Sequence, residues 1–315
     1  MSHALGNPFR LEAAEAFRVW REAKLAAYPQ RAEELLVEVR DPRRLSAAEH
    51  AAIADRLRRA NMAVYATTPG GDGAQAARGE DEVAGAGEAP AREGKERARA
   101  LGRQFGLERL DPNWLADDDG VSSITVREGQ ARGEFIPYTN RAINWHTDGY
   151  YNPPERRIRA FILHCARSAA AGGESLLLDH EIAYLMLRDE NPDWIRALMQ
   201  PGAMTIPERT NEGGVARAAS SAPVFSVDER DGALHMRYTA RSVSIGWARD
   251  AATAGAVARL AAWFAGETPY ALRLRLEPGM GVICNNVLHA RTAFSDDASR
   301  PRLLYRARYY ERIRA

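Results

Sequence analysis

The stretch "NWHTDGYYNPP", residues 144–154, places His146 and Asp148 two residues apart, just before a tyrosine pair and a proline pair. In a β-strand, residues i and i+2 project from the same face, so an imidazole and a carboxylate at a strand end can reach one metal ion. The glycine that follows, Gly149, lets the chain turn away. Two ligands do not make a site, and a third must come from elsewhere.

The stretch "NNVLHARTAF", residues 285–294, offers that third ligand, because His289 follows another strand-like run. Two histidines and one carboxylate on one face of a metal leave coordination positions open, as in non-haem Fe(II) oxygenases. An HxD triplet alone fits equally well a surface or core histidine near an acid. The metal interpretation therefore needs support from a second, independent cluster.

The C-terminal strand "RPRLLYRARYY", residues 300–310, carries such a cluster, since Arg302, Arg306 and Arg308 share one parity. Arginines that point inward must be paired, because an unpaired buried charge costs several kcal/mol. A dicarboxylate beside the metal would supply the counter-charge, and the planar guanidinium suits a carboxylate. The alternative is that this face is exposed to solvent.

The stretch "AGGESLLLD", residues 171–179, has a Gly172-Gly173 turn that leads into a strand with Ser175 near its start. A hydroxyl there could donate a hydrogen bond to a carboxylate oxygen. By itself the stretch predicts only a hairpin turn.

The composition is that of a soluble globular protein, with 45% hydrophobic and 27% charged residues among 315. The formal net charge of +1 gives no case for a nucleic-acid or anionic-membrane partner. Cys165 and Cys284 lack CxxC spacing and are interpreted as buried apolar residues, which favours a reducing cytoplasm. No export signal and no apolar run long enough to span a membrane are found.

Helices are expected at residues 10–27, 46–61, 180–199 and 251–265, the second with a capping box of Ser46 and Glu49. Strand-like runs broken by turn residues follow residue 100, at 121–127, 134–138, 143–147, 158–165, 174–178, 222–227, 233–238, 271–276, 281–284 and 302–310. This pattern predicts a mainly β fold with flanking helices. We interpret His164 as a core histidine, and His180 and His235 as solvated or turn residues.

The chain is expected to form one domain in three parts. Residues 1–66 would supply N-terminal helices and a first strand that pack on the core. Residues 67–98, rich in Gly, Ala and charge, would be a flexible low-complexity insert, because they cannot bury enough apolar surface to become ordered. Residues 99–315 would form the catalytic core.

Together, "WHTDG", "AGGESLLLD" and "LHARTAF…RPRLLYR" resemble the Fe(II)/2-oxoglutarate-dependent dioxygenases of the taurine dioxygenase (TauD/TfdA) family, which is related to clavaminate synthase and γ-butyrobetaine hydroxylase. The likeness covers roughly residues 100–315 and implies a double-stranded β-helix, or jelly roll, with the metal at one open end.

The resemblance also implies roles for individual residues. His146, Asp148 and His289 would be the iron ligands and thus the catalytic centre. Arg302 would bind the distal carboxylate of 2-oxoglutarate together with Ser175, which stands where the family more often has threonine. The cofactors would be Fe(II), 2-oxoglutarate as co-substrate, and dioxygen.

Arg306 would face either the co-substrate or an anionic substrate. The substrate residues are read from position: Asn144 shares strand parity with His146, and Tyr150 follows the metal ligands closely. Arg306 and Arg308 indicate a small anionic or zwitterionic substrate that would be hydroxylated with release of succinate and CO2. Against a substrate role for Tyr150, aromatic residues near a strand end more often pack in the core.

Two other functions remain open at this point. One is a cupin-like iron oxygenase that uses dioxygen alone, which Arg302 with Ser175 disfavours. The other is a non-catalytic jelly-roll protein that binds a ligand. The outcome of the oxidation, the primary substrate and the role of the insert are not determined by the sequence. A homo-oligomer is compatible with the resemblance, but no segment declares an interface.

Overall fold

A computed structural model of the protein describes residues 6–67, 88–112, 117–127, 135–211, 214–241, 245–266, 268–297 and 299–315. The chain divides into two compact units. The first unit consists of Met1–Tyr28, Asn144–Arg157 and Leu178–Ala271, and the second of Pro29–Ile143, Ile158–Leu177 and Leu272–Ala315. Among the described residues, no helix is long and apolar enough to cross a membrane.

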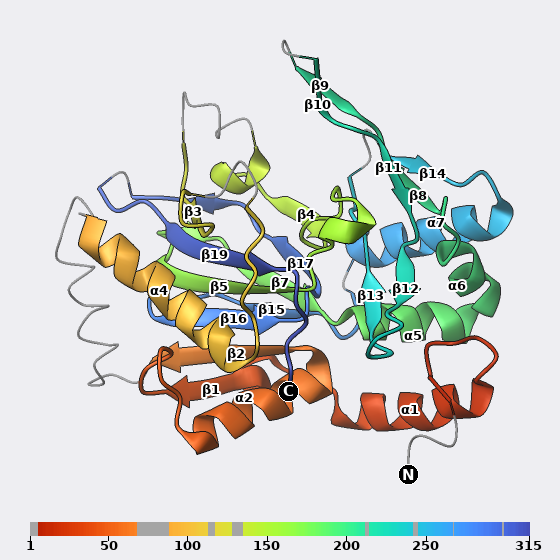
Figure 1. The fold of residues 1–315 in the computed structure, drawn as a ribbon, viewed down its shortest axis with the longest axis horizontal. Helices are drawn as coiled ribbons and strands as arrows, with labels where there is room; N and C mark the ends of the chain where they lie inside the picture. The colour runs from red at the N-terminus through yellow and green to blue at the C-terminus, as the bar shows by residue number, and fades with distance from the viewer. Residues whose placement is uncertain are drawn as a thin grey trace. The chain divides into compact units, whose positions relative to one another are not determined.

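A six-stranded sheet forms the centre of the second unit, in the order β1-β2-β16-β5-β19-β3 (Figure 1). Its strands are β1 (Leu36–Val39), β2 (Met62–Thr67), β3 (Ser122–Ile124), β5 (Ala160–Arg167), β16 (Met280–Cys284) and β19 (Leu303–Tyr309). The β1–β2 pair is parallel and the other pairs are antiparallel. Strands from both ends of the sequence thus meet in one sheet.

Two helices, α2 (Ala47–Ala60) and α4 (Glu88–Gln104), pack on one face of this sheet. Alternate residues of β19, among them Tyr305 and Ala307, point into the core that α4 covers. Because successive strand residues face opposite sides, Arg306 and Arg308 lie on the other face. Every residue of β19 is buried, so both faces of this strand are covered.

Shorter elements complete the second unit. Strands β15 (Leu272–Leu274), β7 (Ser175–Leu178) and β17 (Leu288–Arg291) are neighbours in a second sheet, and β18 (Phe294–Ser295) pairs with β6 (Ala171–Gly172). Two 3-10 turns are η2 (Ala32–Leu35) and η4 (Ile136–Tyr138).

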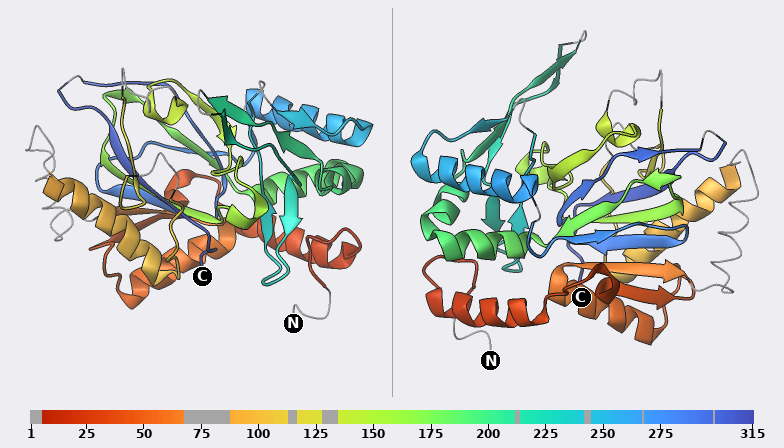
Figure 2. Two further views of the ribbon diagram at one scale, coloured as in Figure 1. Left: turned by 45° about the horizontal axis from the view of Figure 1, so that its top comes forward. Right: turned by 180° about the vertical axis from the view of Figure 1, so that it is seen from behind.

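The first unit combines helices with short antiparallel strands. Its helices are α1 (Ala14–Ala27), α5 (His180–Glu190), α6 (Pro192–Leu198), α7 (Ala251–Ala265) and the 3-10 turn η5 (Pro154–Arg156). Its strands are β8 (Met204–Ile206), β9 (Arg209–Asn211), β10 (Gly214–Arg217), β11 (Ser220–Ala222), β12 (Phe225–Val227), β13 (Leu234–Met236) and β14 (Gly246–Trp247). Figure 2 shows α5, α6 and α7, in green to light blue, grouped together in both views.

The predicted mainly β class with flanking helices is confirmed, but three local predictions were wrong. Residues 88–98 of the predicted insert belong to α4, where Ala98 packs in the core; residues 68–87 lie outside the described part. The helix predicted at 180–199 breaks at Asn191, because Pro192 has no amide hydrogen with which to continue it. Residues 136–138 form a 3-10 turn instead of a strand.

Candidate metal centre

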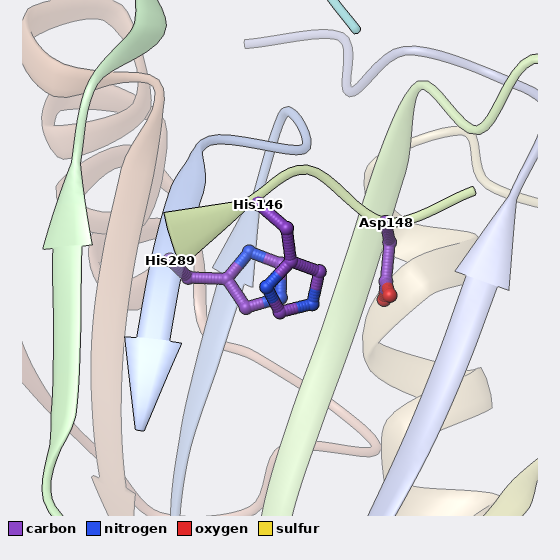
Figure 3. A group of neighbouring side chains, drawn as sticks. All are labelled: His146, Asp148 and His289. Carbon is purple, nitrogen blue, oxygen red and sulfur yellow. The ribbon is translucent and has the colours of Figure 1, made fainter. Parts of the chain in front are cut away.

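The three residues singled out as metal ligands lie together. One ligand atom from each of His146, Asp148 and His289 falls within 4.8 Å of the others. Figure 3 shows the two imidazole rings next to each other, with the carboxylate of Asp148 beside them. Asp148 is buried and both histidines are half-buried, so the group is sheltered but reachable. The sequence prediction that these residues share a site agrees with this geometry.

The backbone sets the tautomer of both histidines. Nδ1 of His146 lies 2.9 Å from the carbonyl oxygen of Asn144, and Nδ1 of His289 lies 3.0 Å from that of Val287. A carbonyl oxygen only accepts hydrogen bonds, so each Nδ1 must carry the proton and donate it. Each Nε2 therefore keeps its lone pair, as a metal ligand requires. The donor set fits a divalent iron that prefers two imidazoles and a carboxylate.

Strand β4 (Ile143–His146) and the turn after it carry the first two candidate ligands, His146 and Asp148. The segment 238–240 runs beside them: Ala240 N donates to Trp145 O at 2.8 Å, and Thr147 N donates to Tyr238 O at 3.0 Å. Thr147 Oγ1 also accepts a hydrogen bond from Tyr238 N at 3.1 Å. Gly149 then turns the chain with φ +67°, a conformation that favours glycine. These bonds on both sides of His146 fix the backbone that carries two ligands.

The third candidate ligand, His289, lies on β17 and packs against Phe161 of β5, with ring centroids 4.8 Å apart. Phe161 is opposite Arg308 in the β5–β19 register. The strand that carries the arginines and the strand that packs on His289 are therefore adjacent.

The arginines on one face of β19, and the arginine just before this strand, are buried. Arg302 is 6% exposed, Arg306 9% and Arg308 3%, so the alternative of a solvent-exposed face was wrong. Arg308 forms an ion pair with Asp111, which is itself buried and also accepts a hydrogen bond from Tyr310 Oη. The suggestion that Arg308 indicates an anionic substrate was therefore wrong, because a protein carboxylate already neutralises its charge.

Arg302 differs from Arg308 in its surroundings. Within the described residues, its guanidinium makes no hydrogen bond or ion pair, and its carbon lies 5.1 Å from the ring centroid of Phe294. Burial lowers the pKa of this guanidinium, although Cys165 and Asp296 act in the opposite direction. A buried cation without a close counter-ion is costly, so this position suits an anionic ligand.

The glycine turn predicted at 172–173 lies against Arg302. A Cβ on Gly173 would be 3.4 Å from Arg302 Nε, and one on Gly172 would be 2.3 Å from the carbonyl oxygen of Ala293, so the backbone approaches closely at both positions. Ser175 begins β7 two residues later and is buried; the described residues offer its hydroxyl no hydrogen bond.

Fewer contacts connect the remaining predicted site residues with the three candidate ligands. Asn144 has an exposed side chain, and its carbonyl orients His146. Tyr150 is half-buried, with its ring centroid 6.4 Å from that of His146. Arg306 is buried on the inner face of β19. His164 is a core residue as expected, but His180, predicted at the surface or in a turn, is 1% exposed and bonds through Nε2 to Leu234 O.

Sequence reasoning missed a group of arginines around the tyrosine pair. Arg237 donates to Tyr150 O at 2.7 Å, Arg241 to Tyr150 Oη at 3.5 Å, and the Arg217 guanidinium carbon lies 5.8 Å from the Tyr151 ring centroid. All of the basic residues except Lys24 and Lys95 are arginines, so residue type alone carried no signal. Arg237 and Arg241 share parity with Thr239, but the bridge between Thr239 and His146 is visible only in the structure.

Residues 89–308 match the family described as "Taurine catabolism dioxygenase TauD, TfdA family". The chain belongs to this family of dioxygenases. Membership confirms the predicted class, a 2-oxoglutarate-dependent dioxygenase, and the predicted use of Fe(II), 2-oxoglutarate and dioxygen, which the His-Asp-His group fits.

Two curated relatives of this TauD/TfdA-family chain are named uridine-5'-phosphate dioxygenase. The one from Amycolatopsis sp. is 33% identical over 54% of this chain and 62% of its own length, so the chain matches less than two thirds of it. The one from Streptomyces sp. is 31% identical over 61% of this chain and 69% of its own. A crystal structure of asparagine oxygenase with Fe(II), 3-hydroxyasparagine and succinate shares the fold, with TM-score 0.59, 17% identity, and coverage of 98% of this chain and 86% of that one.

Proposed function

We propose that the protein hydroxylates a small anionic substrate in an Fe(II)- and 2-oxoglutarate-dependent reaction that releases succinate and CO2. The observation that carries this proposal is the His146, Asp148 and His289 group, with both histidines held in the tautomer that leaves Nε2 available. Three protein ligands on one side of a metal leave room for a chelating co-substrate and for dioxygen. Bound iron, with these two reactants, would supply the oxidising power; the chain supplies position and charge.

We further propose that Arg302 and Ser175 bind the distal carboxylate of 2-oxoglutarate. The buried guanidinium of Arg302 and the glycine turn beside it support this assignment. Arginine and a carboxylate form charge-assisted, often bidentate hydrogen bonds, and a hydroxyl adds a third donor. Arg306, on the same inner face of β19, is proposed to contact the co-substrate or the substrate.

The finer fold assignment is part of this proposal. The two sheets of the second unit are proposed to be the faces of a double-stranded β-helix, which the antiparallel pairing of β5 with β16 and β19 supports. The two free, buried cysteines support a reducing, cytoplasmic location.

The substrate class is proposed to be a nucleoside 5′-monophosphate. The names of the two curated relatives support this class, and such a substrate is small and anionic, as the sequence indicated. Uridine 5′-monophosphate is therefore the first compound to test.

The proposal is tested by spectroscopy without oxygen. Protein with Fe(II) and 2-oxoglutarate is expected to develop the weak visible charge-transfer band of the chelate, and His289→Ala is expected to lack it. Arg302→Gln is expected to form the band only at roughly 10- to 100-fold higher 2-oxoglutarate concentration, because charge-assisted hydrogen bonds are lost.

Arg167→Gln is the matched control, because Arg167 ends the neighbouring strand β5 and its guanidinium donates to a neutral acceptor, the carbonyl oxygen of Pro301, at 3.0 Å. Bound iron without a band in the unmodified protein would contradict the proposal and would favour a dioxygen-only iron oxygenase. Absence of iron binding would favour a ligand-binding protein without catalysis.

A further inference from the structure

The Tyr150-Tyr151 turn that follows the metal ligands is surrounded by three arginines, Arg217, Arg237 and Arg241, here called the arginine cluster. All of these residues belong to the first unit, as do His146 and Asp148. The cluster is not used by the proposed iron or 2-oxoglutarate sites. It nevertheless lies close to the proposed metal site.

Arg237 is the buried base of the cluster. Its guanidinium donates to three backbone carbonyls: Tyr150 O at 2.7 Å, Met204 O at 2.9 Å and Ser220 O at 2.9 Å. These neutral acceptors satisfy its hydrogen bonds but leave its positive charge uncompensated. Burial, together with the nearby positive charges of Arg157 and Arg217, lowers the pKa of Arg237 to about 10. Arg237 thus fixes the tyrosine turn and adds a permanent positive field.

Arg217 lies beside it, half-buried at the end of β10. Its Nη2 donates to Pro207 O at 2.7 Å, and its guanidinium carbon lies 5.8 Å from the Tyr151 ring centroid. Its Nε is buried and, among the described residues, has no hydrogen-bond acceptor. Burial lowers the pKa of Arg217; Tyr150 and Tyr151 act in the opposite direction, and the charges of Arg209 and Arg241 add to the lowering. A buried donor without an acceptor is expensive unless a ligand supplies one.

Arg241 is the exposed member. Its Nη1 lies 3.5 Å from Tyr150 Oη, and no carboxylate pairs with it in the described part of the chain. Arg237 and Arg241 flank the segment 238–240 that is hydrogen-bonded to the strand carrying His146. The Tyr150 ring in turn contacts the His146 ring edge to face, at 6.4 Å. The cluster is therefore linked directly to the metal-binding backbone.

We propose that Arg217, Arg241 and the hydroxyl of Tyr150 bind a phosphate dianion of the substrate, with Arg237 as the positioning residue beneath them. In the described part of the chain no carboxylate pairs with these three positive charges, and such a group matches a doubly charged ligand better than a single carboxylate. Two guanidiniums can each form paired hydrogen bonds to phosphate oxygens. The inference rests on the proposed function, because it assigns the residues that would hold the substrate's anionic end next to the iron.

The test measures binding without turnover. Dissociation constants for uridine 5′-monophosphate, uridine and inorganic phosphate are measured by calorimetry and phosphorus NMR, on anaerobic protein loaded with Fe(II) and 2-oxoglutarate. The monophosphate is expected to bind at least tenfold more tightly than uridine, and inorganic phosphate is expected to bind weakly. Arg217→Gln and Arg241→Gln are each expected to weaken phosphate and monophosphate binding roughly 10- to 100-fold.

Arg196→Gln is the control, because Arg196 is an exposed arginine of the same unit that pairs with Asp193 on α6. Arg241 is exposed, so Arg241→Gln remains informative if Arg217→Gln does not fold. Equal binding of phosphate by the control and both cluster variants, or no binding of phosphate and monophosphate by the unmodified protein, would overturn the inference. The chelate band is recorded in the same samples. If the proposed function is wrong, the band is absent; if only the phosphate assignment is wrong, the band is present.

Discussion

At the scale of single residues, two arginines of similar burial and the same parity, Arg302 and Arg308, have different surroundings. Arg308 meets a buried carboxylate, whereas Arg302 has no counter-ion in close contact within the described residues. The difference arises because Asp111 accepts from both Arg308 and Tyr310 Oη, and its own amide donates to Arg308 O at 2.8 Å. Residue type and parity are the same for both arginines, so only the partner decides their roles.

Breaking the buried Arg308–Asp111 pair is expected to destabilise the protein strongly. Asp111→Ala leaves the buried guanidinium uncompensated, and the free energy of unfolding is expected to fall by about 3–5 kcal/mol, measured by chemical denaturation. Arg109→Gln is the control, because its pair with Glu311 is exposed and is expected to contribute about 0–1 kcal/mol. Similar losses for both variants would show that the buried pair is not special.

At the scale of elements, helix boundaries follow local chemistry closely. The capping box predicted at the start of α2 is confirmed: Ser46 Oγ accepts from Glu49 N at 3.2 Å, and Ser46 N donates to Glu49 Oε2 at 2.6 Å. Burial alone would raise the pKa of Glu49, but hydrogen bonds from the amides of Ser46 and Arg40 lower it overall. Because both partners lie within one helical turn, the pattern is readable from sequence.

Removing this cap is expected to cost about 1 kcal/mol of unfolding free energy in Ser46→Ala, whereas Ser46→Asp, which keeps an acceptor, should cost less.

The contribution of the Glu49 carboxylate to the free energy of unfolding should be complete above its ordinary pKa of about 4.3 and should disappear as the pH falls through its lowered folded-state pKa. Denaturation of wild type and Glu49→Gln across this range measures it. A difference between them that persists at the lowest pH would contradict the assignment.

At the scale of the whole molecule, the central sheet buries a titratable group in its core. His164 on β5 is 0% exposed, and its Nδ1 lies 3.0 Å from Tyr65 Oη on β2, two strands away. Burial lowers the pKa of His164 to about 3, and the charge of Arg97 adds to this. The folded protein therefore keeps this histidine neutral over a range in which an unfolded chain would protonate it.

Acid stability should report this burial. Between pH 6.5 and 3 the unfolded chain binds one more proton at His164, so the free energy of unfolding should fall by about 1.4 kcal/mol per pH unit as the pH decreases. His164→Leu is expected to lose this component of the slope, whereas Tyr65→Phe, which keeps the histidine, should retain it. Parallel pH profiles for wild type and His164→Leu would refute the expectation.

The sequence by itself determined the mainly β class, the approximate positions of several helices and strands, and the three residues, His146, Asp148 and His289, that the structure brings within reach of one metal ion. The His146 and Asp148 pair and the helix cap follow from short-range rules, because side chains two apart in a strand share a face and a helix cap involves residues three apart. The choice of His289 depended on the resemblance to a known family. The helix break at Pro192 could also have been predicted from the sequence, because proline has no amide hydrogen, although the helical periodicity continues through this position.

Only the tertiary structure decided which charges meet. Arg308 finds its carboxylate 197 residues away, and Arg237 finds the carbonyl of Tyr150 87 residues away. Such partners depend on how strands from distant parts of the chain are registered, and many arginines in the sequence compete equally for the same role. The physical reason is that burial makes an unpaired charge or donor costly, so the partner matters most where it is farthest in sequence, while periodicity only says which face a side chain occupies.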